Sequence, residues 1–160
     1  MKLLVFSDSH SNSYKIKEVI DMHKANCRGI VFLGDGIRDI EYIKDQYPQI
    51  PFFIVKGNCD MMARDVESEK LISFDGVRIF ITHGHLYGAK SGYGRLAYRA
   101  RELEADAVFF GHTHIPFDDI IEVGEKRIHL FNPGSIGYDG SFGVVNTSGD
   151  VLVTSHGKLF

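Results

Sequence analysis

The sequence is poor in cysteine, and it lacks both a long apolar run and an excess of basic residues. Its two cysteines, Cys27 and Cys59, cannot form a disulfide framework and do not have the Cys-x-x-Cys spacing of a metal knuckle. We therefore expect reduced thiols and a cytoplasmic protein. No stretch approaches the roughly 20 apolar residues that cross a bilayer. Because Asp8 interrupts a short apolar N-terminus, no signal peptide is expected either.

The charge balance is slightly acidic: 18 Lys and Arg face 21 Asp and Glu, for a net charge of −3. This balance excludes a broad nucleic-acid surface and a surface for anionic membranes. A local phosphate site stays open, because a bound metal can supply the positive charge that side chains do not. With 160 residues, 44% of them hydrophobic, and no internal repeat, the chain predicts one globular domain over residues 1–160.

Apolar runs alternate with helical periodicity in the first third of the chain. Strands are predicted at 3–6, 30–33 and 52–55, and helices at 13–25 and 37–46. This βαβαβ order is typical of a parallel sheet. Further on, Asp75-Gly76 predicts a hairpin between strands 71–74 and 77–82.

The second half of the chain is less regular. Residues 61–70 favour a short helix, and 88–94 a mobile glycine-rich loop. A helix with Leu96, Ala97, Ala100 and Leu103 on its inner face precedes a strand at 107–110. A meander is predicted for the remaining strands, at 120–123, 127–131, 142–146 and 151–155. An α/β fold of two packed sheets flanked by helices accounts for both halves.

Polar residues follow five of the apolar runs, always at the carboxyl end. They are Asp8, His10, Asp35, Asn58, His83, His112 and His114. Ligands of open α/β sheets sit at this edge, where loops from neighbouring strands converge. His112 and His114 are two residues apart, so on an extended segment both rings face the same side.

The composition of this set indicates a catalytic metal site. Asp, Asn and His offer oxygen and imidazole donors and no thiolate cage. Seven ligands exceed the needs of one ion, whereas two ions with one bridging carboxylate use them all. Other roles stay open for individual residues: helix caps for Asp8 and Asp35, a left-handed turn for Asn58, and hydrogen-bonded core positions for His83 and His112. None of these roles explains why all seven residues lie at the same edge of the predicted sheets.

The same residues resemble a known family. Asp8-x-His10, Gly34-Asp35, Gly57-Asn58-x-Asp60, His83-Gly84 and Gly111-His112-x-His114 resemble the five ordered motifs of the calcineurin-like metallophosphoesterases. The length and the Gly57-Asn58-Cys59-Asp60 variant are similar to the compact, YfcE-like branch of bacterial and archaeal phosphodiesterases. The resemblance implies a four-layer α/β-β/α sandwich with a dinuclear site on its upper edge.

The resemblance also assigns roles. It implies that Asp8, His10 and His114 bind one metal, that Asn58, His83 and His112 bind the other, and that Asp35 bridges them. Two divalent cations are expected, with Mn²⁺ first and Ni, Fe, Co, Zn or Mg as alternatives. The implied reaction is hydrolysis of a small phosphodiester, by in-line attack of a metal-bridging hydroxide. Asp35, Asn58 and His83 therefore also count as catalytic candidates.

Two further residues and two other functions complete the expectations. His85 is a catalytic candidate that either contacts the phosphate or holds Asp35 or a backbone carbonyl. Cys59 stands where many relatives have histidine, which predicts weak activity on monoesters and a preference for diesters.

A phosphomonoesterase with the same site is one alternative. A scaffold resembling the retromer subunit of this fold is another, with an apolar surface at Tyr138, Phe142 and Leu159-Phe160. A homodimer or higher oligomer is expected by base rate.

Overall fold

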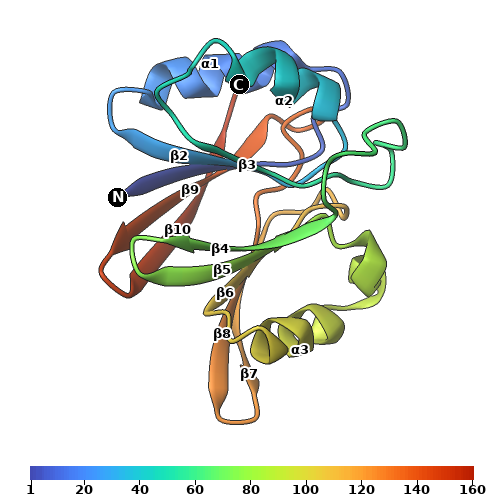
Figure 1. Ribbon diagram of the computed structural model, residues 1–160, viewed down its shortest axis with the longest axis vertical. Helices are drawn as coiled ribbons and strands as arrows, with labels where there is room; N and C mark the ends of the chain where they lie inside the picture. The colour runs from blue at the N-terminus through green and yellow to red at the C-terminus, as the bar shows by residue number, and fades with distance from the viewer.

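A computed structural model describes residues 1–160 as two five-stranded sheets stacked face to face (Figure 1). The first sheet has the strand order β10-β9-β1-β2-β3. Its strands are β1 (Lys2–Phe6), β2 (Cys27–Phe32), β3 (Phe52–Ile54), β9 (Ser141–Ser148) and β10 (Val151–Lys158). β1, β2 and β3 are mutually parallel, as their alternation with helices predicts, while β9 pairs with β1 antiparallel.

The second sheet has the order β4-β5-β6-β8-β7. Its strands are β4 (Glu69–Phe74), β5 (Val77–Thr82), β6 (Ala107–Phe109), β7 (Phe117–Val123) and β8 (Lys126–Asn132). The predicted hairpin at Asp75-Gly76 is confirmed, since β4 pairs with β5 across this turn and both turn residues have positive φ. β5, β6 and β8 run parallel to one another.

Helices cover the two outer faces. α1 (Ser13–His23) and α2 (Ile37–Lys44) lie over the first sheet, and α3 (Gly94–Glu102) lies over the second (Figure 1). The predicted four-layer sandwich is therefore confirmed. Short 3₁₀ helices η1 (His85–Tyr87) and η2 (Ala89–Ser91) precede α3, where the sequence predicted part of a glycine-rich loop. No helix is both long and apolar enough to cross a membrane.

The core has three layers because the sheets are buried on both faces. In β1, Leu4 and Phe6 pack toward α1 and α2, while Leu3 and Val5 pack toward the second sheet. The third layer lies between the second sheet and α3, around Phe110. Burial on both faces explains why these strands are continuous apolar runs rather than alternating ones.

Two expectations about the chain are wrong. Residues 61–70 contain turns and the start of β4 rather than a helix. The late strands do not form one meander, because the hairpin β7–β8 belongs to the second sheet and the hairpin β9–β10 to the first. Residues 133–140 cross between the sheets, so sequence-adjacent hairpins become members of different layers.

Candidate metal centre

The carboxyl ends of the central strands bring the polar residues together, as their positions in the sequence predict. Asp8 follows β1, and Asp35 follows β2 in the same sheet. His83 follows β5 directly, and His112 follows β6 beside it. The site is therefore built where the edges of the two sheets meet, with ligand residues supplied from both.

The backbone at this edge is strained. Only eight non-glycine residues have positive φ, and five of them are predicted metal ligands: Asp8, His10, Asp35, His112 and His114. The left-handed region costs such residues about 1–3 kcal/mol each, and strained residues of this kind concentrate at functional sites. The turns that follow the strands thus orient the donor atoms of the ligands. The packing of the surrounding fold offsets the conformational free energy that these backbone angles cost.

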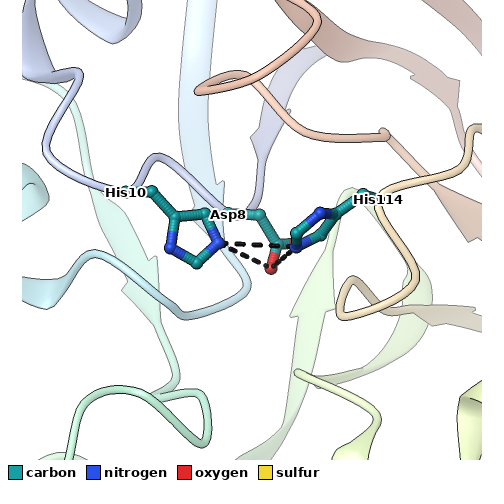
Figure 2. A group of neighbouring side chains, drawn as sticks. All are labelled: Asp8, His10 and His114. Carbon is teal, nitrogen blue, oxygen red and sulfur yellow. Dashed lines mark hydrogen bonds and ion pairs between the residues drawn. The ribbon is translucent and has the colours of Figure 1, made fainter.

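The first group of ligand atoms comes from Asp8, His10 and His114 (Figure 2). The Nε2 atoms of the two imidazoles are 3.4 Å apart, and Asp8 Oδ1 lies 3.7 Å from His10 and 3.1 Å from His114. Tetrahedral ligands about 2.1 Å from a cation are about 3.4 Å from one another. Asp8 Oδ1 is buried and accepts no hydrogen bond, so a cation would satisfy it.

The second group consists of Asp8, Asp35 and His83. His83 Nδ1 lies 2.7 Å from the Leu33 carbonyl, which fixes the proton on Nδ1 and leaves Nε2 free to bind a metal. Nε2 is 3.3 Å from Asp35 Oδ2, is buried, and has no hydrogen-bond partner. The alternative role of His83, a hydrogen-bonded core position, therefore describes only one of its two ring nitrogens. Nδ1 is hydrogen-bonded in the core, and Nε2 faces the site.

Electrostatics at His83 favours a positive charge. Burial works to lower the pKa of His83, but the facing carboxylates of Asp35 and Asp8 outweigh it and raise this pKa. Burial works to raise the pKa of Asp35, but its contacts with His83 and Cys59 outweigh burial and hold this pKa well below the usual range. Two carboxylates around a buried nitrogen form a position that a proton or a divalent cation can occupy.

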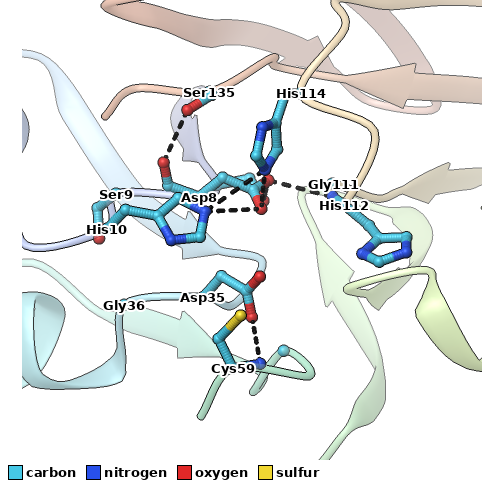
Figure 3. A network of polar contacts seen from close by, with 12 residues as sticks. Asp8, Ser9, His10, Asp35, Gly36, Cys59, Gly111, His112, His114 and Ser135 are labelled. Carbon is cyan, nitrogen blue, oxygen red and sulfur yellow. Dashed lines mark hydrogen bonds and ion pairs between the residues drawn. The ribbon is translucent and has the colours of Figure 1, made fainter. Parts of the chain in front are cut away.

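Hydrogen bonds from neighbouring loops hold the carboxylates in place (Figure 3). Asp8 Oδ2 accepts from the Ser7 hydroxyl at 2.6 Å and from the His112 amide at 3.1 Å, which leaves Oδ1 turned to the imidazoles. Asp35 Oδ1 accepts from the Cys59 amide at 2.8 Å, which leaves Oδ2 turned to His83. In each carboxylate, therefore, one oxygen accepts hydrogen bonds from the protein and the other faces the histidines of the site.

Two glycines allow this close packing of loops. A Cβ on Gly111 would lie 1.9 Å from Ser7 Oγ and 2.8 Å from Asp8 Oδ2. A Cβ on Gly57 would lie 2.1 Å from Asp35 Oδ1. Any side chain at these positions would displace a carboxylate of the site, which is the physical reason for glycine there.

His112 and Asn58 lie outside the two groups. The His112 ring is beside that of His83, with centroids 5.1 Å apart, and Figure 3 shows it turned away from His10 and His114. Burial, followed by the positive charges of His83 and Lys90, lowers the pKa of His112 to about 4, so the ring is neutral at pH 7 and able to bind a metal. Asn58 is exposed, and its amide contacts Cys59 Sγ at 3.6 Å.

The carboxylate shared by the two groups is Asp8, whereas the resemblance implies that Asp35 bridges. Asp8 belongs to both groups, with Oδ1 also 3.9 Å from His83 Nε2, and Asp35 belongs to one. The helix-cap alternative for both residues is wrong, because Asn12 and Gly36 occupy the N-cap positions of α1 and α2. The left-handed alternative for Asn58 is wrong as well, since this residue lies in a turn but its φ is not positive.

The structure bears on one of the two roles expected for His85, the hydrogen bond to Asp35 or to a backbone carbonyl. Neither ring nitrogen forms a hydrogen bond within the chain, and Nδ1 is buried without a partner. The expected bond to Asp35 or to a backbone carbonyl is therefore absent. The ring instead lies near those of His83 and His112, with centroids 5.4 and 6.1 Å away. Burial and then the charge of His83 lower the pKa of His85.

Asp60 is a functional residue to which the sequence assigned no role of its own. Its carboxylate accepts four backbone N–H bonds, from Asp35, Gly36, Ile37 and Gly57, at 2.7–3.0 Å. It thereby ties the loop of Asp35 to the loop of Asn58. The signal within the sequence is an aspartate three residues after Gly57, but the other three donors come from a loop more than 20 residues earlier.

Asn132 has a comparable role on the histidine loop. It is fully buried, and its amide donates to the Gly111 carbonyl at 3.0 Å and to Thr113 Oγ1 at 3.1 Å. His156 Nε2 lies 2.7 Å from the Asn132 carbonyl. These contacts hold the backbone on both sides of His112.

Of the apolar surface expected for a scaffold, only Tyr138 and Phe160 are exposed. Phe142 is only 5% exposed and packs on Phe6 in the core, and Leu159 is partly buried against the same cluster. Tyr138 is exposed, but its ring lies 5.1 Å from those of both His10 and His114, as measured between centroids. Tyr138 is therefore part of the rim of the metal centre.

Comparison with known proteins identifies relatives over most of the chain. The chain is 36% identical over 137 residues to the probable metallophosphoesterase YsnB of Bacillus subtilis, covering 85% of this chain and 75% of that one. A predicted phosphoesterase of Streptococcus pneumoniae superposes with a TM-score of 0.78 at 26% identity, covering 97% of this chain and 87% of that one.

Two more distant structures share the fold. Vps29 of Entamoeba histolytica, solved with Zn²⁺, superposes with a TM-score of 0.75 at 21% identity, over 98% of this chain and 91% of that one. An archaeal phosphodiesterase superposes with a TM-score of 0.69 at 20% identity, over 98% and 99%. The family model of the calcineurin-like phosphoesterase superfamily domain matches residues 1–150. The chain belongs to the calcineurin-like phosphoesterase superfamily.

Proposed function

We propose that this protein is a dinuclear metal-dependent phosphodiesterase that hydrolyses small phosphodiesters. The observation that carries the proposal is the pair of ligand groups that share Asp8 Oδ1, a buried oxygen without a hydrogen-bond partner. Two adjacent cation positions at one sheet edge suit a reaction in which negative charge develops on a phosphoryl group.

The proposed ligands follow the resemblance. Asp8, His10 and His114 would hold one cation, and Asn58, His83 and His112 the other, with Asp35 between them. The proximity of the first three supports the first set directly. For the second set, the support is the free Nε2 of His83 and the neutral ring of His112 beside it.

The cations would supply Lewis acidity, which polarises phosphoryl oxygens and lowers the pKa of water. The charge states of the chain's own residues favour cation binding. Asp35 stays ionised at neutral pH because of its contacts with His83 and Cys59. His112 and His85 stay neutral, so neither adds a positive charge that would repel a cation.

Cys59 supports the choice of a diester over a monoester. Burial and then the neighbouring Asp35 carboxylate raise the pKa of its thiol. The thiol is therefore a weak acid and a poor proton donor to a departing alcohol, and it is equally unsuited to act as a nucleophilic thiolate. A monoester with a poor leaving group would gain little help from this side chain.

Metal titration tests the proposal. Metal-free protein is titrated with Mn²⁺ while hydrolysis of bis-p-nitrophenyl phosphate is followed. We expect metal-dependent turnover that Asp35→Asn reduces by more than about 100-fold. Asp65→Asn is the matched control, because Asp65 is exposed and forms no hydrogen bond or ion pair. Turnover without metal, or unchanged turnover in Asp35→Asn, would refute the proposal.

Metal binding without turnover would instead favour the scaffold alternative, since the Vps29 neighbour was also solved with Zn²⁺. The buried position of Phe142 counts against that alternative, because it removes one of the expected apolar side chains from the surface. Homo-oligomerisation and a cytoplasmic location remain predictions, and light scattering of the purified protein measures the first.

A further inference from the structure

A cavity of about 450 Å³ opens directly beside the candidate metal centre. His10, Asp35 and Cys59 form its inner end, and it extends from there toward the start of α2 and residues 61–63. Its volume is in the range of small-molecule sites, about 300–1,000 Å³. His83, His85 and His112 do not line it, so the cavity lies on one side of the centre only.

Two exposed methionines form the outer wall of the cavity. Met61 is 82% exposed and Met62 is 79% exposed. Adjacent exposed apolar side chains at the mouth of a cavity indicate a contact surface for a ligand. Thioethers adapt to different shapes and interact favourably with aromatic rings.

Hydrogen bonds order the loop that carries these methionines. The Asp60 amide donates to the Gly57 carbonyl at 3.2 Å, and the Ala63 amide donates to the Asp60 carbonyl at 3.0 Å. Lys56 Nζ donates to the Ala63 carbonyl at 3.3 Å. Because the backbone is already fixed, a ligand has only side-chain rotamers to order.

The opposite wall is also preformed. Asp39 of α2 accepts from the Ser9 hydroxyl at 2.5 Å and from the Ser11 amide at 2.9 Å, so the loop after β1 is tied to the helix. Ile37, which is 4% exposed, adds an apolar floor between the two walls.

The charges around the cavity limit the ligand. Arg38 is the sole Lys or Arg in the lining, which also contains the four acidic residues Asp35, Asp39, Glu41 and Asp60. The amides of Gly36 and Ile37 at the start of α2 are already bound to Asp60 and are not free to bind an anion. A ligand group carrying a second phosphate or a carboxylate would therefore be repelled here.

We infer that this cavity binds one ester arm of the substrate, and that the arm is a neutral planar aromatic group, such as an aryl ring or a nucleobase. The inference rests on the proposed phosphodiesterase function of the adjoining centre. It adds Met61 and Met62 as residues that determine specificity without touching the reacting phosphorus.

Two phosphonates test the inference in wild-type protein loaded with Zn²⁺. Phenylphosphonate and methylphosphonate have the same anionic head and differ only in the arm. Calorimetry is expected to show that phenylphosphonate binds about tenfold more tightly, because its ring contacts both methionines. A charged arm, as in 4-phosphonobenzoate, should remove this advantage.

Substitutions test whether Met61 and Met62 cause the preference for phenylphosphonate over methylphosphonate. In Met61→Ser/Met62→Ser, the affinity for phenylphosphonate should fall to that for methylphosphonate, and the latter should stay unchanged. Met61→Leu/Met62→Leu should keep most of the preference, since leucine retains the apolar contact. An unchanged affinity of the serine variant for Zn²⁺ shows that the metal centre remains intact.

A spectroscopic measurement locates the ring without any substitution. The chain has four methionines, Met1, Met22, Met61 and Met62. With ¹³C-labelled methyl groups, phenylphosphonate should shift the resonances of Met61 and Met62 by ring currents and leave the other two in place. Met22 is 57% exposed on α1 and serves as a control.

Three results would overturn the inference. Equal affinity for the two phosphonates in a protein that hydrolyses diesters would refute it and leave the proposed function standing. Unmoved Met61 and Met62 signals together with a shifted Tyr138 ring would place the arm on the other exposed ring beside the centre. Absence of both phosphonate binding and diester hydrolysis would refute the proposed function, and this inference with it.

Discussion

The carboxylate of Asp60 accepts a hydrogen bond of 2.7 Å from the backbone amide of Asp35, 25 residues earlier in the chain. The same carboxylate accepts hydrogen bonds from three more amides, those of Gly36 and Ile37 directly after Asp35 and that of Gly57. Asp60 therefore sets the position of one candidate ligand relative to the loop that carries another. Its own side chain belongs to neither group of ligand atoms.

Asp60→Asn should destabilise the fold and weaken metal binding together. An amide nitrogen cannot accept hydrogen bonds, so two of the four backbone donors lose their partner. We expect the free energy of unfolding in urea to fall by about 2–4 kcal/mol and the metal affinity to fall about 10–100-fold. Asp65→Asn, at an exposed position in the same region, should change stability by less than about 0.5 kcal/mol. Unchanged metal affinity in Asp60→Asn would contradict the positioning role.

His112→Ala and His114→Ala should each weaken a different metal. His114 Nε2 lies 3.1 Å from Asp8 Oδ1 in the first group, whereas His112 lies beside His83 of the second. Calorimetric titration of metal-free protein with Mn²⁺ should show two binding events in the wild type. Each variant should lose more than about 100-fold in affinity for one of them. His23→Gln on α1 is the control, and loss of the same event in both variants would disprove the division of roles.

Cys59→His should raise activity on monoesters more than on diesters. An imidazolium at this position can donate a proton to a departing alcohol, which the thiol with its raised pKa does poorly. We expect kcat/KM for phenyl phosphate to rise about tenfold or more, and kcat/KM for bis-p-nitrophenyl phosphate to change little. Cys59→Ala should give no such rise. Parallel changes on both substrates would show that residue 59 does not act on the leaving group.

The stability of α1 should depend on pH through Asp21. Hydrogen bonds from Lys17, then Lys24 and Tyr47, hold the pKa of Asp21 well below its ordinary value of 3.8. Because the folded-state pKa lies below the unfolded one, the stabilisation is present above pH 3.8 and is lost as pH falls through the folded-state value.

Asp21→Asn should therefore lower the urea midpoint at pH 7, and the difference from wild type should shrink as the pH is lowered below about 4. High salt should reduce the difference as well, because Asp21 is exposed. Asp45→Asn is the control, since Asp45 is exposed and its side chain has no partner. A difference that stays constant with pH would exclude this origin.

Local patterns were sufficient where neighbours in the chain decide the structure. The apolar runs at β1 and β2, the amphipathic face of α2 and the turn at Asp75-Gly76 all follow from propensity and periodicity. They failed at residues 61–70, where charged and irregular sequence is compatible with helix or turn. There, the hydrogen bond from the Lys56 amide to the Glu67 carbonyl and the pairing of β4 decide the outcome.

The sequence by itself determined the types of donor, their order at the ends of apolar runs, and membership of the phosphoesterase superfamily. These properties depend on residue identity and on local spacing. Only the tertiary structure decided which donors meet: Asp8 Oδ1 is shared by both groups, His85 stands without a hydrogen bond, and Asp60 joins two loops. Such relationships depend on distances between atoms of distant segments, and these are set by how the two sheets and their loops pack against each other.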